Sequence, residues 1–138
     1  MRVMALDIGT KNIGVAISDE MGIIAQGKET IRYTSDESTL IEIQKFVKDY
    51  SVGKIVISLP INMNGSSGER VEASRHIAEI IKIKLGIEIV FWDERLSTKE
   101  AETIMISAGI SRYKRKKKID KVAATIILQN YLDWSGNA

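Results

Sequence analysis

The stretch RVMALDIGTKNIGVAIS, residues 2–18, contains the first two strands of the predicted fold. Residues 2–7 form a short apolar run that ends in an acid, and residues 12–18 form a second run after a glycine-containing turn. The turn signal Asp-Glu-Met-Gly at 19–22 then precedes a third strand-like run over 23–31. Three strands joined by short turns predict an antiparallel meander.

The remainder of the chain alternates helical and strand-like patterns. The first predicted helix opens with a capping box at Thr34 and Glu37 and ends near Tyr50, and a strand over 55–59 follows it. A second helix, opened by a capping box at Ser66 and Glu69, leads to a strand over 87–92. Two more helices are predicted over 97–107 and 119–134. A meander that continues into βαβ units predicts an α/β fold in one domain spanning 1–138. Its sheet would be five-stranded and mixed, with strands one to three antiparallel, strands four and five parallel, and helices on both faces.

The composition restricts the chemistry that the chain can perform. There is no cysteine, which excludes disulfides and thiolate metal sites, and the one histidine, His76, makes a zinc site built by the protein alone improbable. His76 lies off the apolar stripe of its helix and is expected to be an ordinary surface residue. Any metal would be a hard cation held by carboxylates, such as Mg²⁺ or Mn²⁺. An acid at position 7 and the lack of a long apolar run predict a cytoplasmic protein without a membrane partner.

Asp7 is the first candidate for chemistry because it ends the first predicted strand beside a glycine-containing turn. Ligands gather at the carboxyl ends of parallel strands, where Asp93 and Glu94 also lie in this interpretation. A carboxylate there can hold a metal or meet a phosphate. A turn-capping aspartate, or a charged strand end paired with Arg95, would give the same pattern. The segment Asp-Ile-Gly-Thr at 7–10 is also similar to the first phosphate loop of actin-like and sugar-kinase ATPases.

Asp120 is placed by the pattern of the last predicted helix. It begins a stripe that should face the sheet and that continues through Ala123, Ala124, Ile127, Leu128 and Tyr131. An acid in the first helical turn can simply compensate the helix dipole, but a carboxylate on the inner edge is costly unless it is paired or metal-bound. Three carboxylates could therefore converge at one sheet edge, as a Mg²⁺-dependent phosphodiesterase requires. One metal would activate water, and a second, about 3.5–4 Å away, would stabilise the leaving oxygen.

One short segment concentrates the positive charge of the chain. The basic segment, residues 112–118, contains Arg112, Lys114, Arg115, Lys116, Lys117 and Lys118. Because the whole chain carries +2 and this segment +6, the remainder carries −4. The basic segment is too polar to pack and is predicted to be a loop between two helices. It is either merely solvated or a flexible arm that contacts phosphates, and its adjacency to Asp120 favours the arm.

Five motifs together resemble the YqgF/RuvX family, which is described both as pre-16S rRNA nucleases and as Holliday junction resolvases. They are ALDIG at 5–9, NIGVA at 12–16, SLP at 58–60 with NGS at 64–66, DERLST at 93–98, and ID at 119–120 with AA at 123–124. The resemblance covers residues 1 to about 134. It implies an RNase H-like fold, distantly related to the RuvC resolvases. The implied activity is divalent-metal-dependent phosphodiester cleavage tied to maturation of the 5′ end of 16S rRNA.

Carried over by motif, the resemblance implies that Asp7, Glu94 and Asp120 are the catalytic and metal-binding acids. Asp93 keeps the second assignment open, because both faces of the fifth predicted strand are apolar. If the strand order is 3-2-1-4-5, the first and fifth strands lie two spacings apart, roughly 9–10 Å, and this gap favours the longer Glu94 side chain.

The expected partner is nucleic acid, either an rRNA precursor or branched DNA, bound by a monomer or homodimer. The candidate contacts are Lys11, Arg95 and the basic segment. Two other functions compete with the nuclease. An ATP-handling protein needs two related domains, and no second Asp-x-Gly loop appears downstream. A nucleic-acid-binding assembly factor with little catalysis would keep the fold, and the three intact acids argue against it.

Overall fold

The computed structural model describes residues 1–9, 11–59, 69–93 and 112–136 of the chain, and for 69–70, 112–121 and 136 it describes the backbone alone. The predicted helix over 97–107 lies outside these residues, as do Pro60 and Ser66. Among the described helices, none has the length and apolar character that a membrane span requires.

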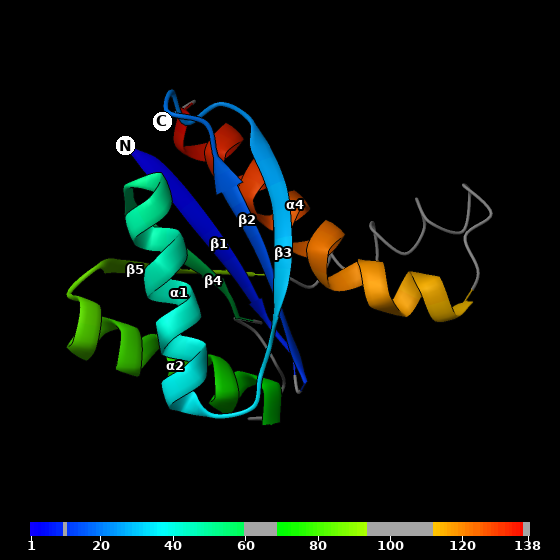
Figure 1. Ribbon diagram of the computed structural model, residues 1–138. Coiled ribbons are helices and arrows are strands. Elements are labelled where there is room, and N and C mark those ends of the chain that lie inside the picture. The colour runs from blue at the N-terminus through cyan, green and yellow to red at the C-terminus, as the bar shows by residue number, and fades with distance from the viewer. Residues whose placement is uncertain (10, 60–68, 94–111, 137–138) are drawn as a thin grey trace.

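Five strands form one mixed sheet with the order β3-β2-β1-β4-β5 (Figure 1). They are β1 (Arg2–Ile8), β2 (Asn12–Ser18), β3 (Ala25–Arg32), β4 (Val52–Ser58) and β5 (Glu88–Trp92). β2 pairs antiparallel with β1 and β3, whereas β4 pairs parallel with β1 and β5. The predicted meander and the two parallel strands are confirmed, and the strand order is the one assumed in comparing Asp93 with Glu94.

Short-range contacts set the turns of the meander. The Gly9 amide donates to the Asn12 carbonyl oxygen at 2.9 Å, and a Cβ on Gly9 would lie 2.7 Å from that oxygen, so the turn requires glycine. In the next turn, Asp19 Oδ1 accepts the amides of Ile23 and Ile24 at 2.7 and 3.1 Å. Because this turn uses residues 23 and 24, β3 begins at Ala25, two residues later than predicted.

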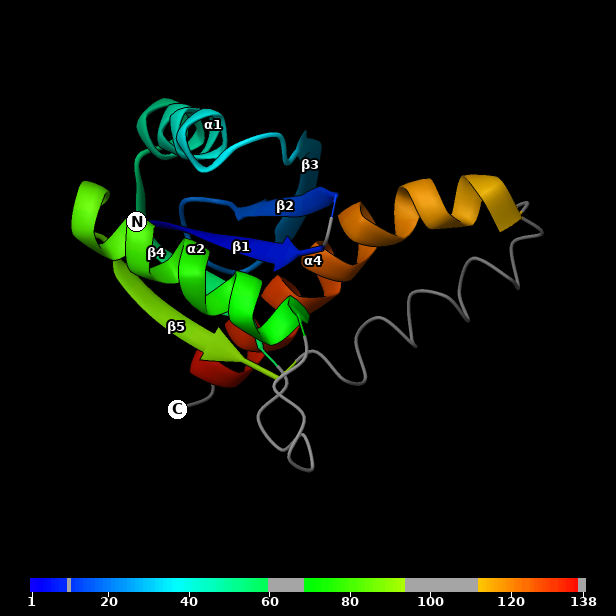
Figure 2. The ribbon, with the colours of Figure 1, turned by 90° about the horizontal axis from the view of Figure 1, so that it is seen from below.

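Helices cover both faces of the sheet, as predicted. α1 (Asp36–Tyr50) and α2 (Glu69–Leu85) pack on one face, against residues such as Leu6 and Ile57. α4 (Arg112–Gly136) packs on the other, against Val3, Ala5 and Val56 (Figure 2). Since successive side chains of a strand point to opposite faces, each central strand supplies both layers. The central strands β1, β2 and β4 are therefore apolar over most of their length.

The start of α1 differs from the predicted capping box. Ser35, rather than Thr34, is the N-cap, and its hydroxyl accepts the Ser38 amide at 3.1 Å. The Thr34 hydroxyl instead bonds to the hydroxyl of Ser38 at 2.7 Å. An N-cap side chain accepts the amide of the second or third helical residue, and Ser38 is the third helical residue after Ser35, so the cap lies one residue later than predicted.

The prediction that the basic segment is a loop is wrong, because α4 begins at Arg112 and contains all of residues 112–118. The segment has no glycine or proline, and lysine and arginine are good helix formers. A polar sequence does not need to pack in order to be helical when solvent surrounds it. Both views show the amino-terminal turns of α4 running on beyond the sheet (Figures 1 and 2).

Candidate active site

Asp7 is a buried acid near the carboxyl end of β1, with 2% of its surface exposed. It lies one residue before the strand ends, not at the end as predicted. Val3 and Ala5, on the same side of β1, pack in the cluster formed with α4, so alternation places Asp7 on the α4 face. Its partner on β2 is Gly14, which contributes no side chain beside the carboxylate.

Ser58, the last residue of β4, contacts this carboxylate. Its hydroxyl donates to Asp7 Oδ1 at 3.0 Å, and only 1% of Ser58 is exposed. The β1–β4 pairing runs through Leu6 and Ile57, so Asp7 and Ser58 follow as the next residues on neighbouring parallel strands. Ser58 belongs to the SLP motif at 58–60, but no role was predicted for it from the sequence. A signal was available, because a serine ends a strand that is otherwise apolar from Ile55 onward.

α4 passes over the Asp7 face, and its predicted apolar stripe is confirmed. Ala123, Ala124, Ile127, Leu128 and Tyr131 are all buried. Asp120 lies in α4 four residues before Ala124, about 6 Å along the helix axis at 1.5 Å per residue. Its side chain is among those that the structure does not describe. In Figure 2 the arrowheads of β1 and β5 point to the same end of the sheet, where α4 passes.

β5 shares the Asp7 face through Val90 and Trp92, which pack against the α4 cluster. The Trp92 ring meets Tyr131 of α4 edge-on, with centroids 5.5 Å apart. Ile89 packs in the opposite cluster, with α1 and α2. The two faces of β5 are therefore distinguishable in the structure, although both are apolar in the sequence. Asp93 follows the strand and is partly buried, whereas Glu94 lies outside the described residues.

Within the described residues, the Asp7 site included, no group of three or more His, Cys, Asp or Glu side chains that could hold a metal ion is found. His76 is on the surface, as expected, and its Nε2 lies 2.6 Å from Asp36 Oδ2, which links α2 to α1. The hydroxyl of Tyr33, and then His76, hold the pKa of the Asp36 carboxyl below its usual value. This contact joins the helices on the face opposite to Asp7, so it belongs to the packing of α1 and α2.

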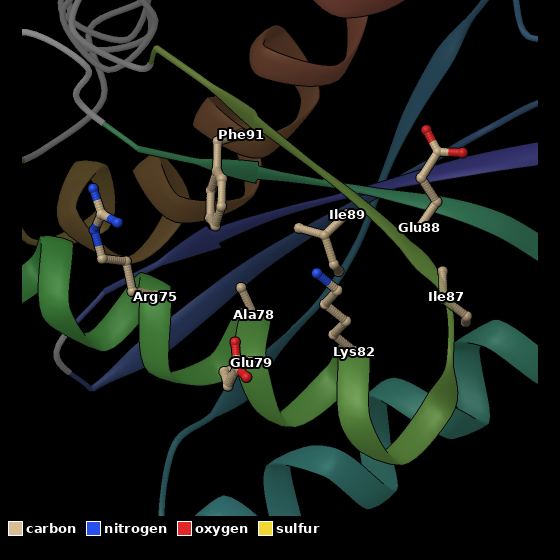
Figure 3. Close-up of a pocket in the computed structure, with 8 residues that line it drawn as sticks. All are labelled: Arg75, Ala78, Glu79, Lys82, Ile87, Glu88, Ile89 and Phe91. Atoms are coloured by element: carbon tan, nitrogen blue, oxygen red, sulfur yellow. The ribbon is translucent and has the colours of Figure 1, made fainter.

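A groove of about 360 Å³ between α2 and β5 is also distinct from the Asp7 site (Figure 3). Arg75, Glu79 and Lys82 of α2 and Phe91 of β5 are among the residues that line it. Its charges are of both signs, and none of its lining residues is a predicted site residue. The groove therefore gives no support to a second catalytic centre.

Lys11 is exposed in the turn that follows β1, close in sequence to Asp7, and its carbonyl oxygen accepts the Tyr33 amide at 2.8 Å. Of the other predicted nucleic-acid contacts, Arg95 lies outside the described residues. The basic segment is described only as backbone, in the first turns of α4.

Comparison with known proteins identifies the relatives of this chain. The family model described as "RuvX: Holliday junction resolvase" matches residues 1–134. Proteins named "Putative pre-16S rRNA nuclease" from Bacillus cytotoxicus and Bacillus subtilis are 52% and 50% identical over 135 residues, which cover 96% of this chain and 98% of each relative.

Solved structures show the same fold. RuvC from T. thermophilus, in complex with a Holliday junction substrate, superposes with a TM-score of 0.61 at 11% identity, covering 100% of this chain and 98% of RuvC. The fowlpox virus resolvase with Holliday junction DNA gives a TM-score of 0.58 at 15% identity, covering 98% and 99% of the two chains. These likenesses confirm the predicted RNase H-like fold. The match over 1–134, together with relatives at half identity over nearly their whole length, shows that this chain belongs to the RuvX family.

Proposed function

We propose that this protein is a cytoplasmic, divalent-metal-dependent endonuclease that hydrolyses phosphodiester bonds in nucleic acid. The observation that carries the proposal is the Asp7 carboxylate, buried near the carboxyl end of β1 on the face that α4 covers. A buried carboxylate is costly unless hydrogen bonds or a cation compensate it. We therefore assign Asp7 as the first metal-binding acid of the proposed active site.

Glu94, rather than Asp93, is the proposed second acid. Val90 and Trp92 lie on the Asp7 face of β5. Because strand side chains alternate between faces, a continuation of the strand would bring position 94, which is Glu94, to the same face. We therefore expect Asp93 to be directed away from Asp7. The distance to be bridged favours the same choice, because β4 separates β1 from β5 and two strand spacings amount to roughly 9–10 Å.

Asp120 is the proposed third acid. It continues the buried stripe of α4 by one helical turn toward the amino terminus, and this stripe packs on the face that holds Asp7. The three acids would hold Mg²⁺ or Mn²⁺, since these hard cations prefer oxygen ligands and the chain has no cysteine. A bound metal of this kind can activate water and stabilise the leaving oxygen. The protein itself supplies the orientation of its carboxylates and a phosphate-binding surface formed by Lys11, Arg95 and the basic segment.

The proposed substrate is the 5′ region of a 16S rRNA precursor. The names of the Bacillus relatives support this choice. Branched DNA is the alternative, and it is favoured by the description of the family model and by the junction-bound RuvC structure. A third possibility is an assembly factor that binds RNA and cleaves little.

A direct comparison of substrates tests the proposal. Purified protein would be incubated with a 16S rRNA precursor that carries its 5′ extension, and separately with a four-way DNA junction, each with Mg²⁺, with Mn²⁺ or with a chelator. We expect metal-dependent cleavage of the RNA. Cleavage of the junction alone would establish the alternative, whereas binding of either substrate without cleavage would favour the assembly factor.

A further inference from the structure

We propose that Ser58 is a positioning residue of the active site, which fixes the orientation of the Asp7 carboxylate for metal binding. This inference rests on the proposed nuclease function. Its basis is the hydrogen bond from the Ser58 hydroxyl to Asp7 Oδ1, which measures 3.0 Å between two residues that are at least 98% buried.

Ser58 is well placed for this role because neighbouring strands fix its backbone on both sides. β4 pairs with β1 through Ile57 and Leu6, and Ser58 itself pairs with Trp92 of β5. The next amide, that of Leu59, donates to the Trp92 carbonyl oxygen at 2.6 Å. The hydroxyl therefore starts from a rigid part of the sheet, where it can hold a flexible side chain in one orientation.

The chemistry of this contact suits a metal-binding carboxylate. A hydroxyl that donates to an ionised carboxylate forms a charge-assisted hydrogen bond, which is stronger than a neutral one. A carboxylate has about four lone-pair positions, so accepting this bond does not by itself prevent Asp7 from binding a cation. Groups that hold metal ligands in this way commonly contribute about 10- to 100-fold to metal affinity or activity.

The location of Ser58 also explains why a small polar residue occupies the end of β4. β4 lies between β1, which carries Asp7, and β5, which leads to Glu94. A large side chain at position 58 would crowd the Asp7 carboxylate, which the Ser58 hydroxyl contacts at 3.0 Å. Serine occupies little of that space while it supplies a donor, which an alanine would not.

Matched variants test the inference on the full chain. Ser58→Ala removes the donor, and Ser58→Cys fills nearly the same space with a weaker donor. Ser18→Ala is the control, because Ser18 is 3% exposed and its hydroxyl accepts the Val3 amide at 2.9 Å, near the opposite end of β1 from Asp7. The probe is Mn²⁺ alone, and its affinity is measured by titration calorimetry without nucleic acid. Cleavage kinetics would be measured separately.

We expect Ser58→Ala to weaken Mn²⁺ binding by about 10-fold and to lower kcat while KM for the nucleic acid stays close to that of the wild type. Ser58→Cys should be intermediate, and it still provides a measurement if Ser58→Ala does not fold. Ser18→Ala should lose stability and keep the wild-type Mn²⁺ affinity.

Two results would overturn the role of Ser58: wild-type Mn²⁺ affinity in the folded Ser58 variants, or an equal loss of affinity in Ser18→Ala. Failure of the wild-type protein to bind Mn²⁺ would be a different outcome, because it would remove the proposed function as well.

Discussion

The packing of α4 on the sheet can be tested by Ile127→Ala, and this packing matters because α4 contains Asp120, the proposed third acid. Ile127 is 0% exposed and belongs to the cluster that joins α4 to Val3 and Ala5. The substitution removes three carbons, which at about 0.8 kcal/mol each amounts to roughly 2.4 kcal/mol of lost burial. The cavity left behind adds to this loss, and isoleucine-to-alanine changes in cores cost about 2–5 kcal/mol. We expect the free energy of unfolding to fall by about 3 kcal/mol.

The measurement is urea unfolding followed by far-ultraviolet circular dichroism. The matched control is Ile83→Ala, the same change in a helix at a residue that is 68% exposed. We expect the control to alter the free energy of unfolding by less than about 0.5 kcal/mol. If Ile127→Ala were as mild as Ile83→Ala, the packing of α4 against the sheet would be refuted.

Three further perturbations address the acids, the basic segment and the response to pH. Glu94→Gln should abolish turnover with little loss of stability, whereas Asp93→Asn should mainly lower stability and leave measurable cleavage; the reverse pattern in these assays would mean that Asp93 is the catalytic acid. If all six basic-segment charges met duplex phosphates, the slope of log K against log salt would be about −5, and neutralising residues 116–118 should reduce it by about 2–3 units; an unchanged slope would exclude the segment from binding. Because the pKa of Asp36 is lowered in the folded state, its stabilising effect should be present above its usual pKa of 3.8 and be lost as the pH falls through the lower folded-state pKa. The difference in the free energy of unfolding between wild type and Asp36→Asn should therefore shrink below about pH 4. It should be small, because 40% of the Asp36 side chain is exposed. A difference that grew in acid would contradict the stabilisation of the Asp36 carboxylate by Tyr33 and His76.

Most of the sheet was predictable because its central strands, β1, β2 and β4, are apolar over most of their length. Short, mostly apolar runs such as residues 2–7 and 55–59 have the length of buried strands, and the turn at Gly9 joins the first two strands directly. The stripe of α4 was predictable for a similar reason, since small and apolar residues recur at helical spacing from Ala123 to Tyr131. Apolar residues recur in the sequence with the period of the helix or strand whose buried face they form, so these elements can be predicted from the sequence.

Contacts between elements were less accessible to sequence analysis. Asp7 was identified, but its bond to Ser58 depends on the register of two strands that are about fifty residues apart. The contact between Asp36 and His76 depends in the same way on how α1 and α2 lie together. The helical state of the basic segment was missed for another reason: polarity indicates exposure, and it does not distinguish a solvated helix from a loop.

The central claim is that Asp7 is the core of a metal-dependent nuclease site, and its most direct test is the cleavage rate of Asp7→Asn with Mg²⁺ or Mn²⁺. Asparagine keeps an oxygen that can accept the Ser58 hydroxyl, so the fold and nucleic-acid binding should survive. Asp49→Asn, at an exposed position of α1, is the matched control and should remain active. We predict that wild type and Asp49→Asn cleave only with the divalent metal, while Asp7→Asn binds substrate without turnover. Full activity of Asp7→Asn, or full wild-type activity in excess chelator, would contradict the claim.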